Sequence, residues 1–137
     1  MISDKEIVIV DTHIFIWDIL DPEKIPSRIL KLLNHAQEHS LLFLCSISLW
    51  ETGMLVGKDR IQLNRPVDLF LKIGLMKRKY QLIEITPEIA LEVSKMAVSI
   101  NKDPADRIIA ATVLAHSATL ITADKNLRKY KYLNTIW

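Results

Sequence analysis

Glycine and cysteine are scarce in this sequence. Only three of its 137 residues are glycine, which excludes the glycine-rich loops that bind phosphate in many nucleotide-binding proteins. The single cysteine, Cys45, cannot form an internal disulfide bond, and nothing in the composition favours an oxidising compartment. The first residues, Met1–Glu6, are polar and unlike a signal peptide, and the longest apolar stretch, Leu41–Trp50, is too short to cross a membrane. We therefore expect a soluble, cytoplasmic protein without a membrane segment.

Neither sign of charge dominates the composition. Eighteen lysines and arginines stand against sixteen aspartates and glutamates, so the formal net charge is only +2. Half of the residues are hydrophobic, which excludes low-complexity disorder. A chain of this length is typical of one domain and is long enough to bury a core. We predict a single domain over residues 1–137, because no linker or internal repeat divides the chain.

Short apolar runs, typical of strands buried on both faces, alternate with segments of helical periodicity. The predicted strands are Ile7–Val10, Leu41–Cys45, Gln81–Ile85, Thr119–Thr122 and a last one within Leu133–Trp137. The predicted helices are Ile14–Leu20, those beginning at Pro26, Pro66, Pro87 and Pro104, one capped by Ser46 or Ser48 with Ile47, Trp50, Met54 and Leu55 on its apolar face, and a short basic one at Lys125–Lys129. This alternation predicts an α/β fold, with helices on both faces of a mostly parallel sheet.

Two acidic residues stand at the ends of predicted strands. Asp11 directly follows Ile7–Val10, and Asp124 closely follows the strand at Thr119–Thr122. In open α/β sheets, ligands bind outside the carboxyl ends of the strands, so both carboxylates are placed to reach one. Each could instead cap the helix that follows it.

Two further acids fall on apolar helix faces. Glu51 has Ile47, Met54 and Leu55 as its helical neighbours. Asp106 likewise has Ile109, Ala110 and Val113 on its side of the helix. An unpaired charge there is costly. Two structural explanations remain open, namely an arginine partner for Glu51, and a capping arrangement in which Asp103 caps the helix and Asp106 is its third residue.

Taken together, the four acids favour a metal site. Carboxylates gathered in one crevice repel each other and raise each other's pKa, and a bound divalent cation removes that penalty. A set of oxygen ligands suits Mg²⁺ or Mn²⁺ better than Zn²⁺. Such a site supports metal-assisted hydrolysis of a phosphate ester.

Four segments carry a family resemblance over essentially the whole chain. They are Ile7–His13, Ser46–Glu51, Asp103–Ala111 and Leu120–Asp124. In this order and at this spacing they resemble the PIN-domain ribonucleases, most closely the VapC-type toxins of toxin–antitoxin modules. The resemblance implies a three-layer α/β/α sandwich around a parallel five-stranded sheet of order 3-2-1-4-5, with Asp11 and Asp124 on neighbouring strands.

The same resemblance implies a metal-dependent endoribonuclease that uses Mg²⁺ or Mn²⁺. It implies RNA as substrate, a cognate antitoxin protein as partner, and a homodimer. The residues that match the family's catalytic, metal-binding quartet are Asp11, Glu51, Asp106 and Asp124, and those that match auxiliary positions are Asp103 and Thr122. Relatives often carry His and Phe where this sequence has Asn101 and Ala105, which affects the expected substrate contacts more than the chemistry.

Two basic clusters are candidates for contact with RNA. Lys125, Arg128 and Lys129 begin one residue beyond Asp124, and we predict that they bind RNA phosphates. The second cluster, Lys77–Lys79, fits phosphate binding and solvated helix ends equally well.

Trp17 and Trp50 are predicted to pack in the interior rather than to stack on nucleotides. The alternative function is a catalytically silent, PIN-fold module that only binds a protein partner.

Overall fold

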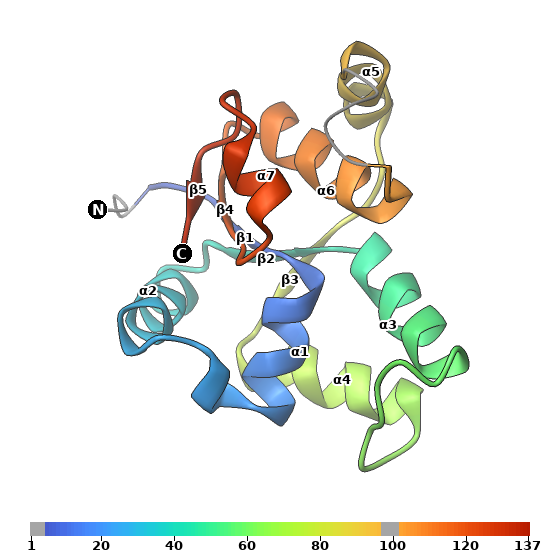
Figure 1. Ribbon diagram of the computed structural model, residues 1–137. Helices are drawn as coiled ribbons and strands as arrows, with labels where there is room; N and C mark the ends of the chain where they lie inside the picture. Colours follow the sequence, from blue (N-terminus) through green and yellow to red (C-terminus); the bar gives the residue numbers. More distant parts are fainter. Residues whose placement is uncertain (1–4, 97–101) are drawn as a thin grey trace.

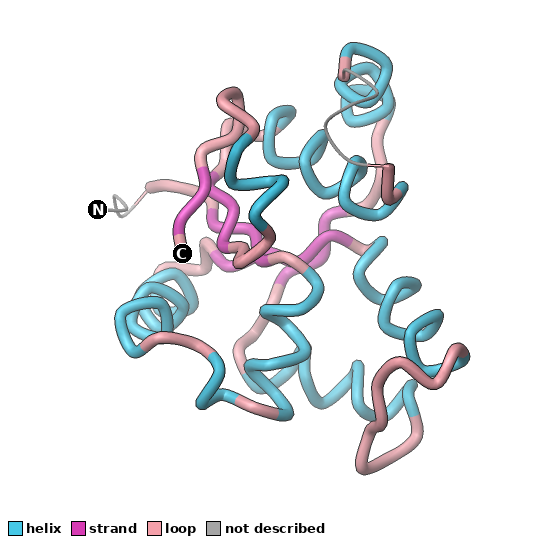
Figure 2. Tube along the Cα trace, in the orientation of Figure 1, coloured by secondary structure: helices cyan, strands magenta, loops and turns pink. Residues whose placement is uncertain are grey.

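The protein is described by a computed structural model, in which residues 5–96 and 102–137 are placed. Its strands are β1 (Val8–Val10), β2 (Leu42–Cys45), β3 (Gln81–Ile83), β4 (Thr119–Ile121) and β5 (Thr135–Ile136). Its helices are α1 (Thr12–Leu20), a 3-10 turn (Pro22–Lys24), α2 (Ser27–Glu38), α3 (Ile47–Gly57), α4 (Val67–Lys77), α5 (Pro87–Lys95), α6 (Pro104–Ala115) and α7 (Lys125–Lys129). Figures 1 and 2 show the sheet in the middle with helices on both sides.

The five strands form one parallel sheet in the order β3-β2-β1-β4-β5, which confirms the predicted fold class. β1 is central, and Val10 is in register with Leu44 of β2 and with Ile121 of β4. The ladder continues one residue further, because the Asp11 N–H donates to the Ile121 carbonyl at 3.0 Å. The ends of β1 and β4 therefore lie side by side, at the point where the direction of strand order reverses.

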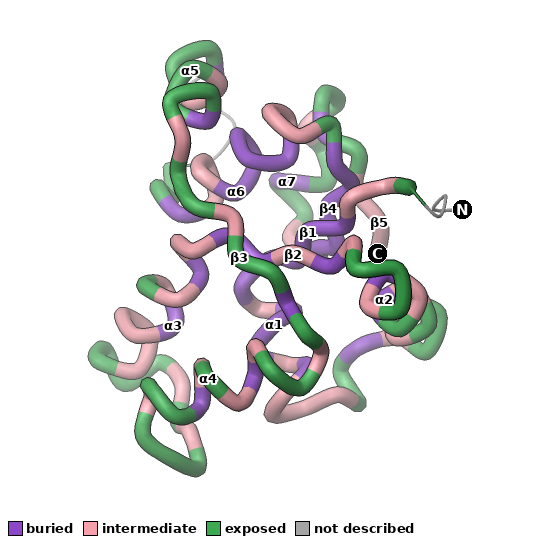
Figure 3. The backbone as a smooth tube through the Cα atoms, turned by 180° about the vertical axis from the view of Figure 1, so that it is seen from behind, coloured by how far each residue is buried: buried purple, intermediate pink, exposed green. Residues whose placement is uncertain are grey.

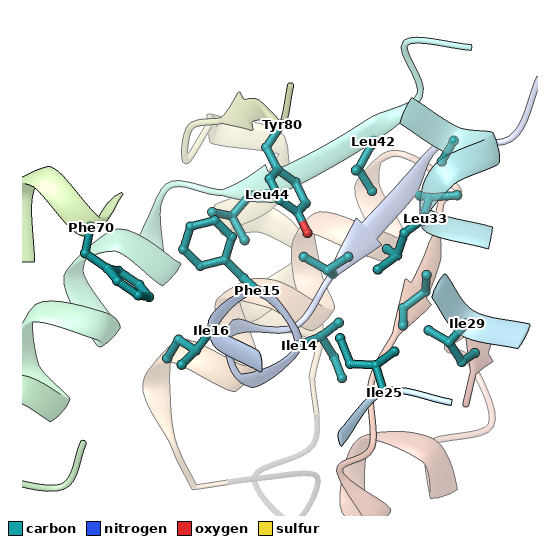
Figure 4. Close-up of a cluster of buried hydrophobic side chains, with 14 residues drawn as sticks. Ile14, Phe15, Ile16, Ile25, Ile29, Leu33, Leu42, Leu44, Phe70 and Tyr80 are labelled. Atoms are coloured by element: carbon teal, nitrogen blue, oxygen red, sulfur yellow. The ribbon is translucent and has the colours of Figure 1, made fainter. Parts of the chain in front are cut away.

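Alternating side chains of β1 reach the two halves of the core. Val8 and Val10 pack on one face with α1, α2 and α4, a cluster drawn in Figure 4. Ile9 packs on the other face with α5, α6 and α7. All three residues are fully buried, as a strand covered on both faces requires. In contrast, β3 is an edge strand, and Figure 3 shows much of it exposed.

Acidic and hydroxyl side chains set where several helices begin. Asp11 accepts a hydrogen bond from the Thr12 N–H and so starts α1 at Thr12, two residues before the predicted start. The Thr86 hydroxyl caps α5 by accepting from the Ile89 N–H. Pro26 and Pro66 lie just before α2 and α4 rather than inside them, because their ψ of 145° is extended.

The expected apolar face of α3 is only partly correct. Ile47 and Leu55 pack against the core, but Trp50 is 57% exposed, and the fully buried residues of the helix are Ser48 and Thr52. Ser48 shares a hydrogen bond with Thr12 at 2.8 Å, so the buried face of α3 is bonded to α1 through hydroxyls. Neither serine caps α3, because Ser46 precedes the helix but makes no capping hydrogen bond through its side chain. Trp17, as predicted, is partly buried against the core.

The second basic cluster contains a structural arginine. Arg78 donates from Nε to Asp18 at 2.6 Å, and the Tyr80 hydroxyl donates to the same carboxylate oxygen at 3.1 Å. Asp18 is 1% exposed, so the pair joins the buried face of α1 to the end of α4. Arg78 is therefore neither a solvated helix end nor free to bind phosphate. In the part of the chain that the structure describes, no helix combines the length and hydropathy that a membrane crossing needs.

We predict that Arg78→Gln destabilises the fold by about 3 kcal/mol, because it leaves the Asp18 carboxylate buried without its cation. Chemical denaturation measures the change. Lys79→Gln, at the exposed neighbouring position, is the control and should cost less than about 0.5 kcal/mol. Equal stabilities of the two variants would contradict a structural role for Arg78.

Candidate metal centre

Acidic side chains from four elements converge at the carboxyl edge of the sheet. Asp11 follows β1 and Asp124 follows β4, while Glu51 lies on α3. Asp103 and Asp106 lie at the start of α6. The charges of the other four carboxylates all act on Asp106, which is therefore the electrostatic centre of the group.

Three of these carboxylates come closest together. Glu51, Asp103 and Asp106 each offer an oxygen that lies within 4.8 Å of the other two. Oxygens at this separation can share one cation with waters completing its shell, as Mg²⁺ or Mn²⁺ requires. Asp103, predicted as an auxiliary acid, is thus part of the tightest group, whereas Asp11 and Asp124 lie outside it.

Asp11 is held from three directions. Its Oδ1 accepts from the Thr12 N–H at 2.8 Å, and its Oδ2 accepts from the Thr122 hydroxyl at 2.6 Å. His13 Nδ1 lies 3.4 Å from the same Oδ2. The carboxylate is only 2% exposed, so its orientation is fixed by the fold rather than by solvent. Thr122 also accepts from the Asp124 N–H at 3.0 Å, which ties the two strand ends together.

Two other acids also cap helices, as the structural explanations required. Asp103 Oδ1 accepts from the N–H groups of Ala105 and Asp106, and Asp124 Oδ1 accepts from those of Asn126 and Leu127. Capping occupies one oxygen of each carboxylate. An ionised carboxylate has about four acceptor positions. Capping and metal binding are therefore compatible at these residues.

Glu51 carries the observation that most favours a cation. Its Oε1 is buried and has no hydrogen-bond partner among the described residues. The arginine partner that was the alternative explanation for Glu51 is not found: among the described residues, no salt bridge to Glu51 is present. A buried acceptor without a donor is costly, and a cation would satisfy it. The donor set, made only of carboxylate oxygens, fits Mg²⁺ or Mn²⁺.

Burial and mutual repulsion raise the pKa values of these acids. Loss of hydration is the larger cause at Asp106, and repulsion from the other four carboxylates adds to it, so that its pKa rises from 3.8 to about 8. Burial likewise raises the pKa of Glu51. The pKa of Asp11 is raised by burial although His13 and the hydrogen bonds from Thr122 and Thr12 act to lower it.

Sequence reasoning missed some residues that shape this centre. His13 bridges Asp11 and the β4–α7 connection, because its Nε2 accepts from the Ala123 N–H at 3.2 Å. The proton of the neutral ring is then on Nδ1, facing Asp11. Thr12 contacts both Asp11 and Glu51, and its hydroxyl shares a hydrogen bond with the buried Ser48. Only the position of His13 two residues after Asp11 could have drawn attention to it.

The predicted RNA-binding residues lie beside this centre. Lys125, Arg128 and Lys129 are exposed on α7, which begins directly after Asp124. Of the two departures from the family pattern, Ala105 is buried at the start of α6, while Asn101 lies outside the described residues.

Residues 8–132 match the family model of the PIN domain. This chain belongs to the PIN domain family. The PIN domain is 31% identical over 132 residues to Ribonuclease VapC22 of Mycobacterium tuberculosis, which covers 95% of this chain and 98% of that protein. The family assignment made from the four acidic motifs is thereby confirmed.

Solved structures with the same fold include two VapBC complexes. One is VapBC2 from Rickettsia felis bound to a promoter DNA fragment, with a TM-score of 0.72, 19% identity, and coverage of 96% of this chain and 98% of that one. The second is DNA-bound VapBC from Salmonella typhimurium, with a TM-score of 0.71, 17% identity, and coverage of 96% of this chain and 97% of that one. FitAcB from Neisseria gonorrhoeae is also similar, with a TM-score of 0.60, 20% identity, and coverage of 96% of this chain and 97% of that one. At these identities, the likeness concerns the fold of this PIN domain.

The raised pKa of Asp106 predicts a stability that depends on pH. Between about pH 4 and pH 8, the metal-free folded protein retains a proton on Asp106 that the unfolded chain has released. The melting temperature in EDTA should therefore fall as the pH rises from 5 to 8.

Asp106→Asn should flatten this decline, because the amide does not titrate. Asp59→Asn is the matched control, since Asp59 is exposed and its positive φ of 55° suits asparagine. The control should keep the slope of the wild type. An Asp106→Asn protein with the wild-type slope would contradict this account of the centre.

Proposed function

We propose that this PIN domain is a Mg²⁺- or Mn²⁺-dependent endoribonuclease and the toxin of a toxin–antitoxin module. The unpartnered Oε1 of Glu51, among carboxylates of raised pKa, carries the proposal because it calls for a cation. The similarity to Ribonuclease VapC22 supports RNA as the substrate class.

The proposed ligands are Asp11, Asp106 and Asp124, with Glu51 as a further ligand or as the group that orients water. Asp103 assists from within the same cluster. When bound, a divalent cation lowers the pKa of water and stabilises negative charge on a phosphate oxygen.

The residues around the centre orient the proposed ligand Asp11. Thr122 and the Thr12 N–H fix the rotamer of Asp11, so that both of its oxygens are directed before any ligand arrives. His13 supports the same carboxylate and holds the Ala123 N–H. Such supporting groups cost about 10–100-fold in metal affinity or activity when removed.

We propose that the partner is an antitoxin protein and that the toxin forms a homodimer. Support for the antitoxin partner comes from the similarity of the fold to the VapBC2 and VapBC structures, whereas the homodimer rests on the family resemblance alone. The proposed location is the cytoplasm, where an RNA substrate is available.

The test is cleavage of a labelled single-stranded RNA by the purified protein. We expect cleavage with Mn²⁺ or Mg²⁺, none in EDTA, and a loss of more than about 100-fold in Asp11→Asn, because loss of a direct ligand should exceed the effect of a supporting residue. Asparagine keeps the shape of the aspartate, and Asp59→Asn again serves as the control.

Activity that survives both EDTA and Asp11→Asn would contradict the metal-dependent mechanism. A wild type that binds no metal and cuts no RNA would instead support the rival, a silent module that binds protein only.

A further inference from the structure

A hollow of about 680 Å³ lies between α7 and the end of the sheet. We call it the cationic hollow, and its lining residues are Lys125, Arg128, Lys129, Thr135, Ile136 and Trp137. Three of the six side chains are cationic and none is acidic. The three cations are exposed, and salt bridges to them are not found among the described residues. The hollow therefore suits an anionic ligand with an apolar part.

The cationic hollow opens at the same edge of the sheet as the metal centre. β5 pairs in parallel with β4, and the Thr122 N–H donates to the Ile136 carbonyl at 3.3 Å. Thr122 in turn bonds Asp11, so Trp137 follows β5 at the level of the carboxylates. Figure 1 shows α7 and β5 next to each other on this side of the molecule.

A row of aromatic rings connects the metal centre with the cationic hollow. His13, beside Asp11, meets Trp17 edge-on at 5.0 Å between ring centroids, and Trp17 lies 6.1 Å from Trp137. Arg28 donates to the main-chain oxygen of Trp137 at 2.6 Å. Trp137, which lines the hollow, is thus held in place by a ring contact and by a backbone hydrogen bond.

We propose that the cationic hollow binds the backbone phosphates of single-stranded RNA next to the cleaved bond, and that one base stacks on Trp137. The inference rests on the proposed ribonuclease function. Cations that follow a backbone, combined with an aromatic platform, are the usual means of binding single strands. A base can stack on a side chain only when it is unpaired, so the substrate here is single-stranded rather than a duplex.

The first test measures binding of a fluorescein-labelled ten-residue oligouridylate by anisotropy, in EDTA to prevent cleavage. The double variant Arg128→Gln/Lys129→Gln should bind more than about tenfold more weakly. Its dependence of log affinity on log salt should be less steep by roughly 0.7 for each lost phosphate contact. Lys31→Gln/Lys72→Gln, which changes exposed lysines on α2 and α4, is the charge-matched control and should bind like the wild type.

The second test addresses the platform. Trp137→Ala should weaken binding about tenfold, as loss of one stacked base does. Trp137→Phe retains a ring for stacking and for packing on Trp17, and should recover most of the affinity. In cleavage assays, both the alanine and the double variant should raise KM with little change in kcat, because the contacts lie outside the reacting group.

The two proposals fail in different ways. If the wild type cleaves RNA but the variants keep its KM and salt dependence, the inference about the hollow is overturned and the ribonuclease function stands. If no divalent metal supports cleavage, the proposed function fails. The binding assay in EDTA then still decides whether the hollow holds RNA, and unchanged affinity in the double variant would overturn that as well.

Discussion

The burial of several carboxylates in one crevice is the constraint on which this structure depends. Loss of hydration is the larger part of the cost of charging Asp106, and repulsion from the four other acidic side chains at the carboxyl edge of the sheet adds to it. The fold brings them together nonetheless, through a central strand, its neighbour and two helices. In the absence of metal, Asp106 retains its proton at neutral pH, and we propose that a bound cation replaces this proton.

The fold tolerates this crowding because each acid has local support. Asp11, Asp103 and Asp124 all accept backbone N–H groups at helix starts, where the helix dipole favours negative charge. Thr122 links the two strand ends, and His13 braces Asp11 from α1. The same capping bonds that begin the helices therefore also aim the carboxylates.

Much of this could be predicted from the sequence, because strong local signals and tertiary structure agree. All five strands fall where apolar runs predict them, and the order of the sheet follows from the family resemblance. The face of α3 was predicted only in part: Ile47 and Leu55 pack on the core, but the fully buried Ser48 forms a hydroxyl hydrogen bond with Thr12 of α1. Periodicity cannot reveal such a contact.

The site, too, could be predicted from the sequence only in part. The motifs point to four acids, but the membership of Asp103 in the tightest group depends on how α6 meets α3. Arg78 looks like one of three surface cations and is instead paired with Asp18, sixty residues earlier. Both depend on contacts between distant segments, which a local pattern cannot show.

Counting the protons released on metal binding tests the central claim most directly. Mn²⁺ is titrated calorimetrically into the metal-free protein at pH 7, in two buffers of different ionisation heat. The wild type should release about one proton or more for each Mn²⁺ bound, and Asp106→Asn about one fewer, because Asp106 has a pKa of about 8. Binding of Mn²⁺ to the wild type without proton release, or no binding to the wild type at all, would contradict the account.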